Sequence, residues 1–243
     1  MLEFLANTFG EAYARLDQIK FNKRSSLHRT TVSLYATIME QTQDAIALQQ
    51  AGKHATLDII LRSTLEAFVD LVNLCRDDTY LDHMQASFHE QWIRLAEQGV
   101  AAGNPFLKDF HNDPTAAAQL DQHKADLDAL SDTPPLSVYE RFRRAGMADA
   151  YRSVYNSLCN ETHNNIRALM SRHLRVDGND LEVVAFDEPA AESLASTLSS
   201  FSGILVQSSV IIHTFFKTDA RETISALAAK HQAFMEDYVA KMQ

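Results

Sequence analysis

Residues 54–77 read HATLDIILRSTLEAFVDLVNLCRD and show the periodicity of a helix. At about 100° per residue, one broad face is apolar, and it consists of Leu57, Ile60, Leu61, Leu65, Phe68, Leu71, Val72 and Cys75. The opposite sector holds four polar residues, Arg62, Glu66, Asp70 and Asn73, together with the apolar Ile59 and Val69. The pattern therefore predicts a central helix that carries a polar stripe.

Two interpretations of the stripe remain open. It is either a solvated face, in which charged residues four positions apart form weak ion pairs, or a buried cluster. A solvated face would leave Ile59 and Val69 in water. Buried charges need partners from another helix, because removing an ion from water costs several kcal/mol.

Helical patterns cover most of the chain on both sides of this segment. With only 7 Gly and 5 Pro in 243 residues, breaks are few, which favours long helices. Helices are predicted at about 2–20, 27–50, 54–76, 79–101, 114–130, 137–145, 147–172, 189–216 and 219–241. Residues 103–113 are predicted to form a loop. No linker or repeat appears, so we expect a single helical domain over residues 1–243.

One segment departs from the helical pattern. LRVDGNDLEVVAF, residues 174–186, places β-formers on both sides of an Asp-Gly-Asn-Asp turn, which is typical of a hairpin. Since a two-stranded hairpin is not stable alone, we expect it to lie against the helices. The predicted fold class is all-α: a multi-helix bundle with one short β-hairpin inserted near 174–186.

Charge and composition narrow the functional classes. The formal net charge of −10 disfavours general DNA binding and a membrane-surface role. Residues 140–175 are nevertheless basic, with seven arginines against three acidic residues. The apolar run 201–216 is too short and too polar to span a bilayer, and the N-terminus lacks the basic region of a signal peptide. We therefore expect a cytoplasmic protein.

No cofactor or metal signature is present in the sequence. Nucleotide-binding glycine motifs, H-E-x-x-H and the Glu-x-x-His of di-iron bundles are absent. Cys75 and Cys159 have no zinc-ligand spacing and are predicted to be reduced core thiols. Asp78, Asp82 and His89 are interpreted as a solvated face. We predict no cofactor and no metal.

A second polar surface is predicted on the helix that contains DAYRSVYNSLCNETHNNIRAL, residues 149–169. One side carries Arg152, Asn156, Cys159, Asn160, His163 and Arg167. The other side is mainly apolar and includes Tyr155. His163 lies in the basic segment, four residues after Cys159. A Cys–His nucleophile pair is disfavoured, because neighbours on one rigid helix have poor geometry for attack and proton transfer.

These two segments carry a family resemblance. Residues 62–66 read RSTLE and residues 155–163 read YNSLCNETH. They resemble a bacterial family of unknown function with R-[ST]-x-x-E-A on one helix and Y-R-x-[LM]-S-x-x-x-H on a later one, a family that in turn resembles the HEPN superfamily. Asn156 replaces the usual Arg, and Cys159 replaces the usual Ser. The resemblance covers roughly residues 30–215.

The resemblance implies helical-bundle proteins that include metal-independent ribonuclease toxins and phage-defence effectors, often as homodimers. The HEPN spacing of Arg and His occurs at Arg167…His173 and Arg76…His83. Two such matches are no more than chance gives for this composition, and neither includes His163. The ribonuclease signature is therefore not established by sequence.

Three functions stay open at this level. The first is a binding or regulatory module of a bacterial defence or toxin-type system, in which a buried Arg/Glu/His cluster holds a nucleotide-like ligand or simply fixes the bundle. The possible partners are RNA or a nucleotide-like ligand. The second is a metal-independent ribonuclease with His163 as general base and arginines on the phosphate. The third is a purely structural cluster in an interaction protein. A homodimer is expected.

The candidate residues are the same for all three functions. The candidate catalytic residues are His163, Arg62 and Glu66. The candidate ligand-binding residues are Asp70, Asn73, Arg152, Tyr155, Asn156, Cys159, Asn160 and Arg167.

Overall fold

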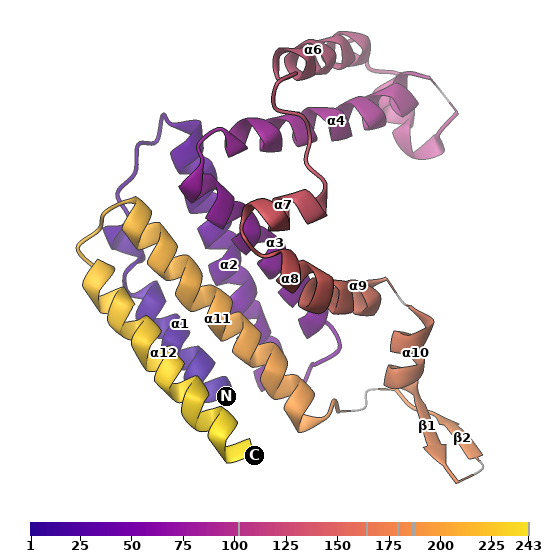
Figure 1. The fold of residues 1–243 in the computed structure, drawn as a ribbon. Coiled ribbons are helices and arrows are strands. Elements are labelled where there is room, and N and C mark those ends of the chain that lie inside the picture. Colours follow the sequence, from indigo (N-terminus) through magenta and orange to yellow (C-terminus); the bar gives the residue numbers. More distant parts are fainter. Residues whose placement is uncertain (102, 164, 179, 186–187, 243) are drawn as a thin grey trace.

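The computed structural model describes residues 1–101, 103–163, 165–178, 180–185 and 188–242 (Figure 1). The α-helices are α1 (Leu2–Tyr13), α2 (Ser26–Gln50), α3 (Leu57–Arg76), α4 (Tyr80–Val100), α5 (Lys108–His111), α6 (Ala116–Ala129), α7 (Val138–Arg144), α8 (Ala148–Ala150), α9 (Asn156–Thr162), α10 (Ile166–His173), α11 (Ala191–Phe215) and α12 (Arg221–Met242). Short 3-10 turns are η1 (Leu16–Gln18) and η2 (Pro105–Leu107), and η3 (Tyr151–Tyr155) is a π-helical turn. The strands are β1 (Leu174–Asp177) and β2 (Asp180–Val183). The all-α fold with one short hairpin is confirmed.

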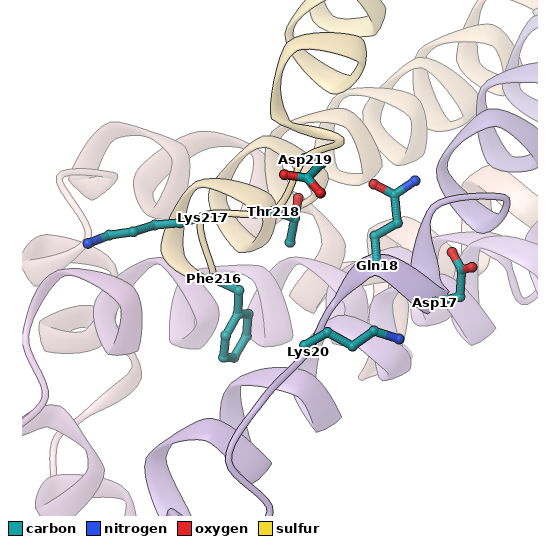
Figure 2. A pocket seen from close by; sticks show the side chains of 7 residues that line it. All are labelled: Asp17, Gln18, Lys20, Phe216, Lys217, Thr218 and Asp219. Carbon is teal, nitrogen blue, oxygen red and sulfur yellow. The ribbon is translucent and has the colours of Figure 1, made fainter.

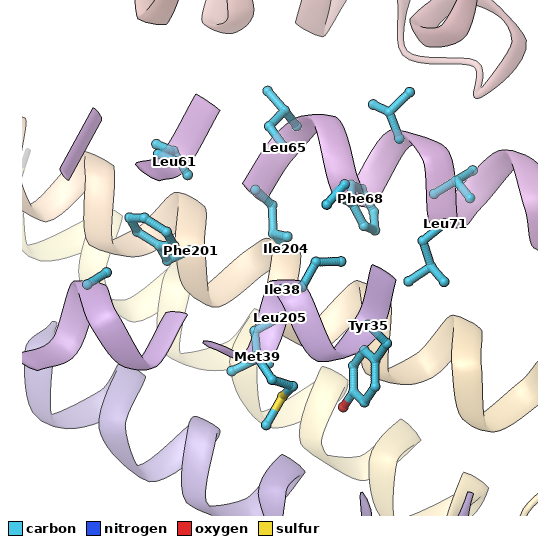
Figure 3. Packing of buried hydrophobic residues seen from close by; sticks show 14 of the residues in the cluster. Tyr35, Ile38, Met39, Leu61, Leu65, Phe68, Leu71, Phe201, Ile204 and Leu205 are labelled. Carbon is cyan, nitrogen blue, oxygen red and sulfur yellow. The ribbon is translucent and has the colours of Figure 1, made fainter. Parts of the chain in front are cut away.

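The core is formed where α2, α3 and α11 pack side by side (Figure 1). Apolar side chains from all three helices interlock there, as Figure 3 shows for Ile38, Phe68 and Phe201. The helices α1, α7 and α9 add further buried side chains to the same cluster. This packing buries the apolar face of α3 that the sequence predicted.

The helix α11 has the length and composition to cross a membrane, and half of its most apolar window is buried. In the structure it is a central helix, with α1, α2, α3 and α12 packed against it. Phe201, Leu205 and Ile212 are fully buried. Its hydrophobicity is therefore accounted for by packing within the bundle.

The polar stripe of α3 is covered over much of its length. Val69 is fully buried and Ile59 is 40% exposed, so only the N-terminal end of the stripe reaches water. Asp70 and Asn73 are buried. A solvated face is therefore wrong for the C-terminal half of the stripe.

The predicted helix 147–172 is broken into several pieces. It begins as α8, passes through the π-helical turn η3, continues as α9 and ends at Thr162. A new helix, α10, begins at Ile166, where the Asn165 side chain accepts a hydrogen bond from the Arg167 backbone N–H. This Asn cap competes with continuation of the helix, so His163 lies at a helix end rather than on a helix face.

Three further boundaries differ from the sequence predictions. The first helix ends at Tyr13 rather than near 20, and η1 follows it. The predicted loop 103–113 contains η2 and α5. The hairpin ends at Val183, and residue 186, where its predicted end lies, is outside the described residues. The hairpin also projects from the bundle instead of packing on it (Figure 1).

One buried histidine makes folding sensitive to acid. His213 is fully buried, its Nδ1 lies 2.7 Å from Thr218 Oγ1, and its Nε2 has no hydrogen-bond partner in the described part of the chain. Burial, with a smaller effect of Arg15, lowers the pKa of His213 below its usual 6.5. The unfolded chain therefore takes up a proton first as pH falls.

We predict that stability is retained above about pH 6.5, the ordinary histidine pKa, and is lost progressively below it. His213→Asn places an amide near the position of Nδ1 and should flatten this dependence. Urea unfolding of both proteins at neutral and mildly acidic pH measures it. His111→Asn, at an exposed position, is the control. If the His213→Asn protein lost as much stability between neutral and mildly acidic pH as the wild type does, His213 would not be the cause of the acid sensitivity.

Candidate functional site

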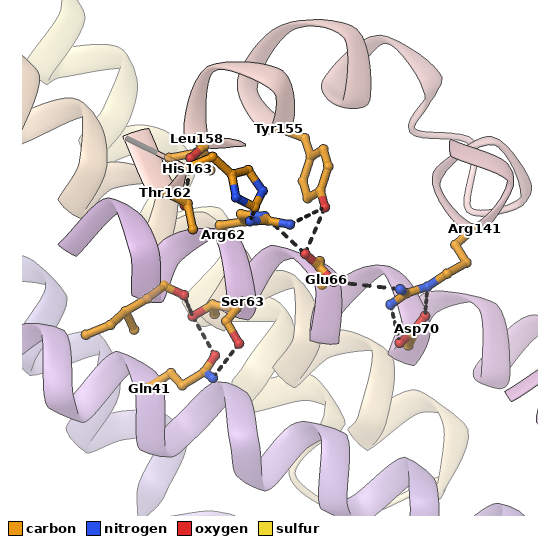
Figure 4. Close-up of polar contacts among 12 residues, drawn as sticks. Gln41, Arg62, Ser63, Glu66, Asp70, Arg141, Tyr155, Leu158, Thr162 and His163 are labelled. Carbon is orange, nitrogen blue, oxygen red and sulfur yellow. Dashed lines mark hydrogen bonds and ion pairs between the residues drawn. The ribbon is translucent and has the colours of Figure 1, made fainter. Parts of the chain in front are cut away.

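Arg62 is the centre of a polar network between α3 and the η3–α9 segment (Figure 4). Its Nη1 donates to His163 Nε2 at 3.2 Å, and its Nη2 donates to the Tyr155 hydroxyl at 3.2 Å. Its Nε lies 3.3 Å from Glu66 Oε1, within ion-pair distance but not aligned for a hydrogen bond. All three guanidinium nitrogens thus face polar partners.

Tyr155 closes this part of the network. Its hydroxyl accepts from Arg62 and donates to Glu66 Oε1 at 2.9 Å. The Arg62 guanidinium carbon also lies 5.3 Å from the centre of the Tyr155 ring, within range of a cation–π contact. Burial, followed by the hydrogen-bonded Glu66, raises the pKa of Tyr155, although its contact with Arg62 opposes this. The hydroxyl therefore keeps its proton and remains a donor.

Arg141 of α7 extends the network along α3. Its Nε and Nη2 donate to the two oxygens of Asp70 at 2.9 and 2.6 Å, a bidentate pair. Its Nη1 lies 3.7 Å from Glu66 Oε2. The Tyr80 hydroxyl donates to Asp70 Oδ1 at 2.6 Å. We use "the polar network" for Arg62, Glu66, Asp70, Tyr80, Arg141, Tyr155 and His163.

The pKa values of Arg141 and Tyr80, which both contact Asp70, follow from their partial burial and from the Asp70 charge. Burial alone would lower the pKa of Arg141, but the Asp70 carboxylate and its hydrogen bonds raise it above the ordinary value. Burial and the neighbouring Asp70 charge both raise the pKa of Tyr80. Arg141 is therefore always charged and Tyr80 is always protonated. The two guanidiniums of the network face two carboxylates, so its formal charges cancel.

The network becomes more exposed from one end to the other. The side chain of Asp70 is 12% exposed, those of Arg62 and Glu66 are 21% and 27% exposed, and His163 is exposed. The Arg/Glu/His cluster is therefore half-buried rather than buried as predicted. The reason is that α9 ends at Thr162, so His163 contacts Arg62 from the rim.

Helix α3 is itself fixed to α2 by a polar contact. The Gln41 amide donates to Ser63 Oγ at 2.9 Å, and its oxygen accepts from Thr64 Oγ1 at 2.8 Å (Figure 4). Ser63 and Thr64 are the two residues that follow Arg62 in the chain. This contact fixes the rotation of α3, and with it the direction in which Arg62 and Glu66 point.

The structure brings six of the predicted residues together. All three candidate catalytic residues, His163, Arg62 and Glu66, are in the network, as are Asp70 and Tyr155. Asn73 supports it by donating to the Arg141 carbonyl oxygen at 2.9 Å.

The remaining predicted residues lie outside it. Arg152 contacts Tyr139 and Asp149, and Asn156 donates to the Arg152 carbonyl oxygen. Asn160 and Arg167 are exposed. Cys159 is half-buried and packs against the core. Cys159 nevertheless lies close enough to Arg62 and Tyr155 to interact electrostatically with both.

Sequence reasoning missed Arg141 and Tyr80. Arg141 was visible only as one arginine of the basic segment. Its i,i+3 and i,i+4 neighbours Arg144 and Ala145 give no sign that it points inward. The one available signal was an unpaired Asp70 on a core helix, which required a cation from somewhere else in the chain.

Hollows also occur apart from the network. One, of about 360 Å³, lies between η1 and the α11–α12 turn and is lined by residues 17–18, 20 and 216–219 (Figure 2). A second, of about 410 Å³, is lined mainly by apolar side chains of α1, η1 and α2. Neither includes a residue of the polar network. Within the described ranges, no group of three His, Cys, Asp or Glu residues is arranged to hold a metal ion.

Comparison with known proteins places part of the chain in a family. Residues 28–181 match the model described as "Family of unknown function (DUF5677)". This range contains the whole polar network. No curated protein and no solved structure matches the chain.

We predict that Arg141→Met destabilises the fold by roughly 2–3 kcal/mol, somewhat less than the loss of a fully buried ion-pair partner. The substitution keeps the length of the side chain but leaves the Asp70 carboxylate without its guanidinium. Urea denaturation measures the loss. The double variant Asp70→Asn, Arg141→Met removes both charges and should recover most of the stability. A single variant as stable as the wild type would show that the pair does not anchor α7.

Proposed function

The chain belongs to the DUF5677 family of unknown function, and we propose that its polar network binds the phosphate group of RNA or of a nucleotide-like ligand. The module would be HEPN-like and would act in a bacterial defence or toxin-type system in the cytoplasm. The HEPN and defence parts of this proposal are supported only by the resemblance of residues 62–66 and 155–163.

The single observation that carries the binding proposal is the contact between Arg62 Nη1 and His163 Nε2 at 3.2 Å. It joins a fixed guanidinium to an exposed imidazole. Both groups are common partners of phosphate oxygens, and Nη1 of Arg62 is a charged donor that a phosphate oxygen can accept from. A phosphate at this rim would replace the imidazole as the partner of Nη1.

The inner part of the network supports binding by holding Arg62 in place. Tyr155 and Glu66 occupy its other nitrogens. An arginine that is already oriented loses less conformational freedom when a ligand arrives. Exposed polar residues of the same segment, Arg152, Asn156 and Asn160, extend the surface available to a longer ligand.

The charge balance favours binding over catalysis. Each guanidinium of the network faces a carboxylate, Arg62 with Glu66 and Arg141 with Asp70. No uncompensated cation is left in the network to stabilise the extra charge of a phosphoryl transition state. Asn156, which replaces the arginine usual in the resembling family, does not supply one.

One observation favours a ribonuclease as second candidate. Arg62 has only donors, so His163 Nε2 must accept in their contact and therefore carries a lone pair. That is the form a general base needs to take the proton of a ribose 2′-hydroxyl. A ribose would have to displace Arg62 from this nitrogen before the imidazole could act. The purely structural alternative requires no ligand at all.

The first test is binding of a short single-stranded RNA and, separately, of a nucleoside monophosphate. Wild-type protein should bind at low salt, and RNA affinity should fall as salt rises because phosphate contacts release counterions. His163→Ala should weaken binding roughly tenfold or more, the cost of losing one contact to a charged group. Fluorescence anisotropy measures the RNA arm, and calorimetry measures the nucleotide arm.

His163→Ala should change the free energy of unfolding by no more than about 0.5 kcal/mol, since the residue is exposed. His111→Ala is the matched control and should bind as the wild type does. Absence of binding to both probes at low salt would leave only the structural role.

The second test separates binding from cleavage. With a chelator present, we predict that RNA incubated with wild-type protein stays intact, as gel electrophoresis would show. Cleavage that yields 2′,3′-cyclic phosphate ends and disappears in His163→Ala would replace the binding proposal with the ribonuclease. Cleavage that persists in His163→Ala would indicate a contaminating nuclease and would support neither activity at this site.

A further inference from the structure

Helices α4 and α6 carry two histidines that face each other. The Nδ1 atoms of His89, on α4, and His123, on α6, lie 2.9 Å apart, which is hydrogen-bond distance. Both side chains are half-buried. Two lone pairs or two N–H groups would repel each other at this distance, so one nitrogen has to carry a hydrogen and the other has to accept it.

A neighbouring carboxylate decides which histidine donates. Asp126 Oδ2, on α6, lies 3.9 Å from His89 Nδ1, and a carboxylate favours a hydrogen on the nitrogen that it faces. His89 Nδ1 is therefore the donor and His123 Nδ1 is the acceptor. The neutral His123 ring then carries its hydrogen on Nε2.

The acceptor ring is also held by aromatic side chains of α4. The His123 ring is parallel to that of Trp92, with centroids 5.7 Å apart, and Phe88 meets it edge-on at 5.8 Å. His123 thus contacts three side chains of α4 at once. Trp92 is the only tryptophan in the sequence, so it reports on this contact by its fluorescence.

Few other charges face the histidine pair. Helices α3, α5 and α6 pack against α4. On α6, Lys124 is paired with Glu97 of α4 at 3.0 Å, and on α4 itself Glu90 is paired with Arg94 at 3.0 Å. In the described part of the chain, Asp126 is the one carboxylate within 4 Å of either imidazole.

The other two neighbouring helices meet α4 away from the pair. Phe110 of α5 lies beside Gly99, near the end of α4. Tyr80, the first residue of α4, bonds to Asp70 of α3, and His83 Nδ1 lies 2.7 Å from the Pro134 carbonyl oxygen. These last contacts anchor the start of α4 and the segment that follows α6. The middle of α6 is held mainly by α4.

Successive protons have opposite effects on this contact. The first can add to His89 Nε2, which leaves the Nδ1–H in place and strengthens its hydrogen bond through the added charge. Asp126 balances that charge. A second proton has to add to His123 Nδ1, the acceptor itself. Two cationic N–H groups then face each other with one carboxylate nearby, so the two imidazoles titrate as a coupled pair.

We propose that the His89–His123 pair makes the α4–α6 hairpin a pH-sensitive switch. The hairpin stays closed while the pair holds no more than one extra proton, and α6 separates from α4 when both imidazoles are charged. Because α4 and α6 extend from the bundle (Figure 1), this opening leaves the α2–α3–α11 core intact. The switch goes beyond the proposed ligand and does not depend on it.

Hydrogen exchange of the full chain, compared between neutral and mildly acidic pH and corrected for the intrinsic pH dependence of exchange, tests the proposal. Amides of α6 should exchange about tenfold faster at acidic pH, the change that the loss of one hydrogen bond gives. Amides of α11, which contains His213, should stay protected. The Trp92 emission should shift to longer wavelength over the same pH range.

Two variants remove the conflict without removing the contact. His89→Asn keeps the stack of Trp92 on His123 and supplies an amide that can either donate to or accept from the imidazole. His123→Asn keeps an acceptor near the position of Nδ1 that takes up no proton. In both, exchange of α6 should lose its acid response. His111→Asn, at an exposed position of α5, is the control and should respond as the wild type does.

Three results would overturn the switch. One is exchange of α6 in the wild type that does not change with pH. Another is an acid response of wild-type size in either Asn variant. The third is equal acceleration of α6 and α11, since that would indicate unfolding of the whole bundle rather than opening of the hairpin.

Discussion

A charged residue on a helix that belongs to the core has to be paired, and this constraint organises the structure around α3. Glu66 and Asp70 lie one turn apart on a helix whose other face is packed into the bundle. Leaving either carboxylate without a cation would cost several kcal/mol. Arg62 supplies one cation from the same helix, and Arg141 supplies the other from α7. The chain between α3 and α9 therefore has to return over α3.

The constraint explains what the sequence could and could not predict. The four-residue spacing of Leu57, Leu61 and Leu65 was enough to predict α3 and its buried face, because periodicity is a local property. The meeting of Arg62 and Glu66 with His163 was predicted because each lay in a short motif that resembles a known one. The structure bears out that these three side chains come together.

Arg141 could not be predicted in the same way. It lies 71 residues from Asp70, and the intervening α4–α6 pair contributes nothing to the network except Tyr80. Which of seven arginines turns inward depends on the loop after α6 and on the start of α7 at the Ser137 capping box. The break at His163 was missed for a related reason. A single Asn cap at residue 165 outweighs the helical pattern on both sides of it.

The exposure of the network increases toward His163, and helix α10 begins at that end. The inner end, Asp70 with Arg141 and Tyr80, is a fixed anchor of matched charge. At the outer end one face of Arg62 meets an imidazole that water can reach. Since α10 begins three residues after His163, a ligand that approaches Arg62 from the rim would pass the junction between α9 and α10.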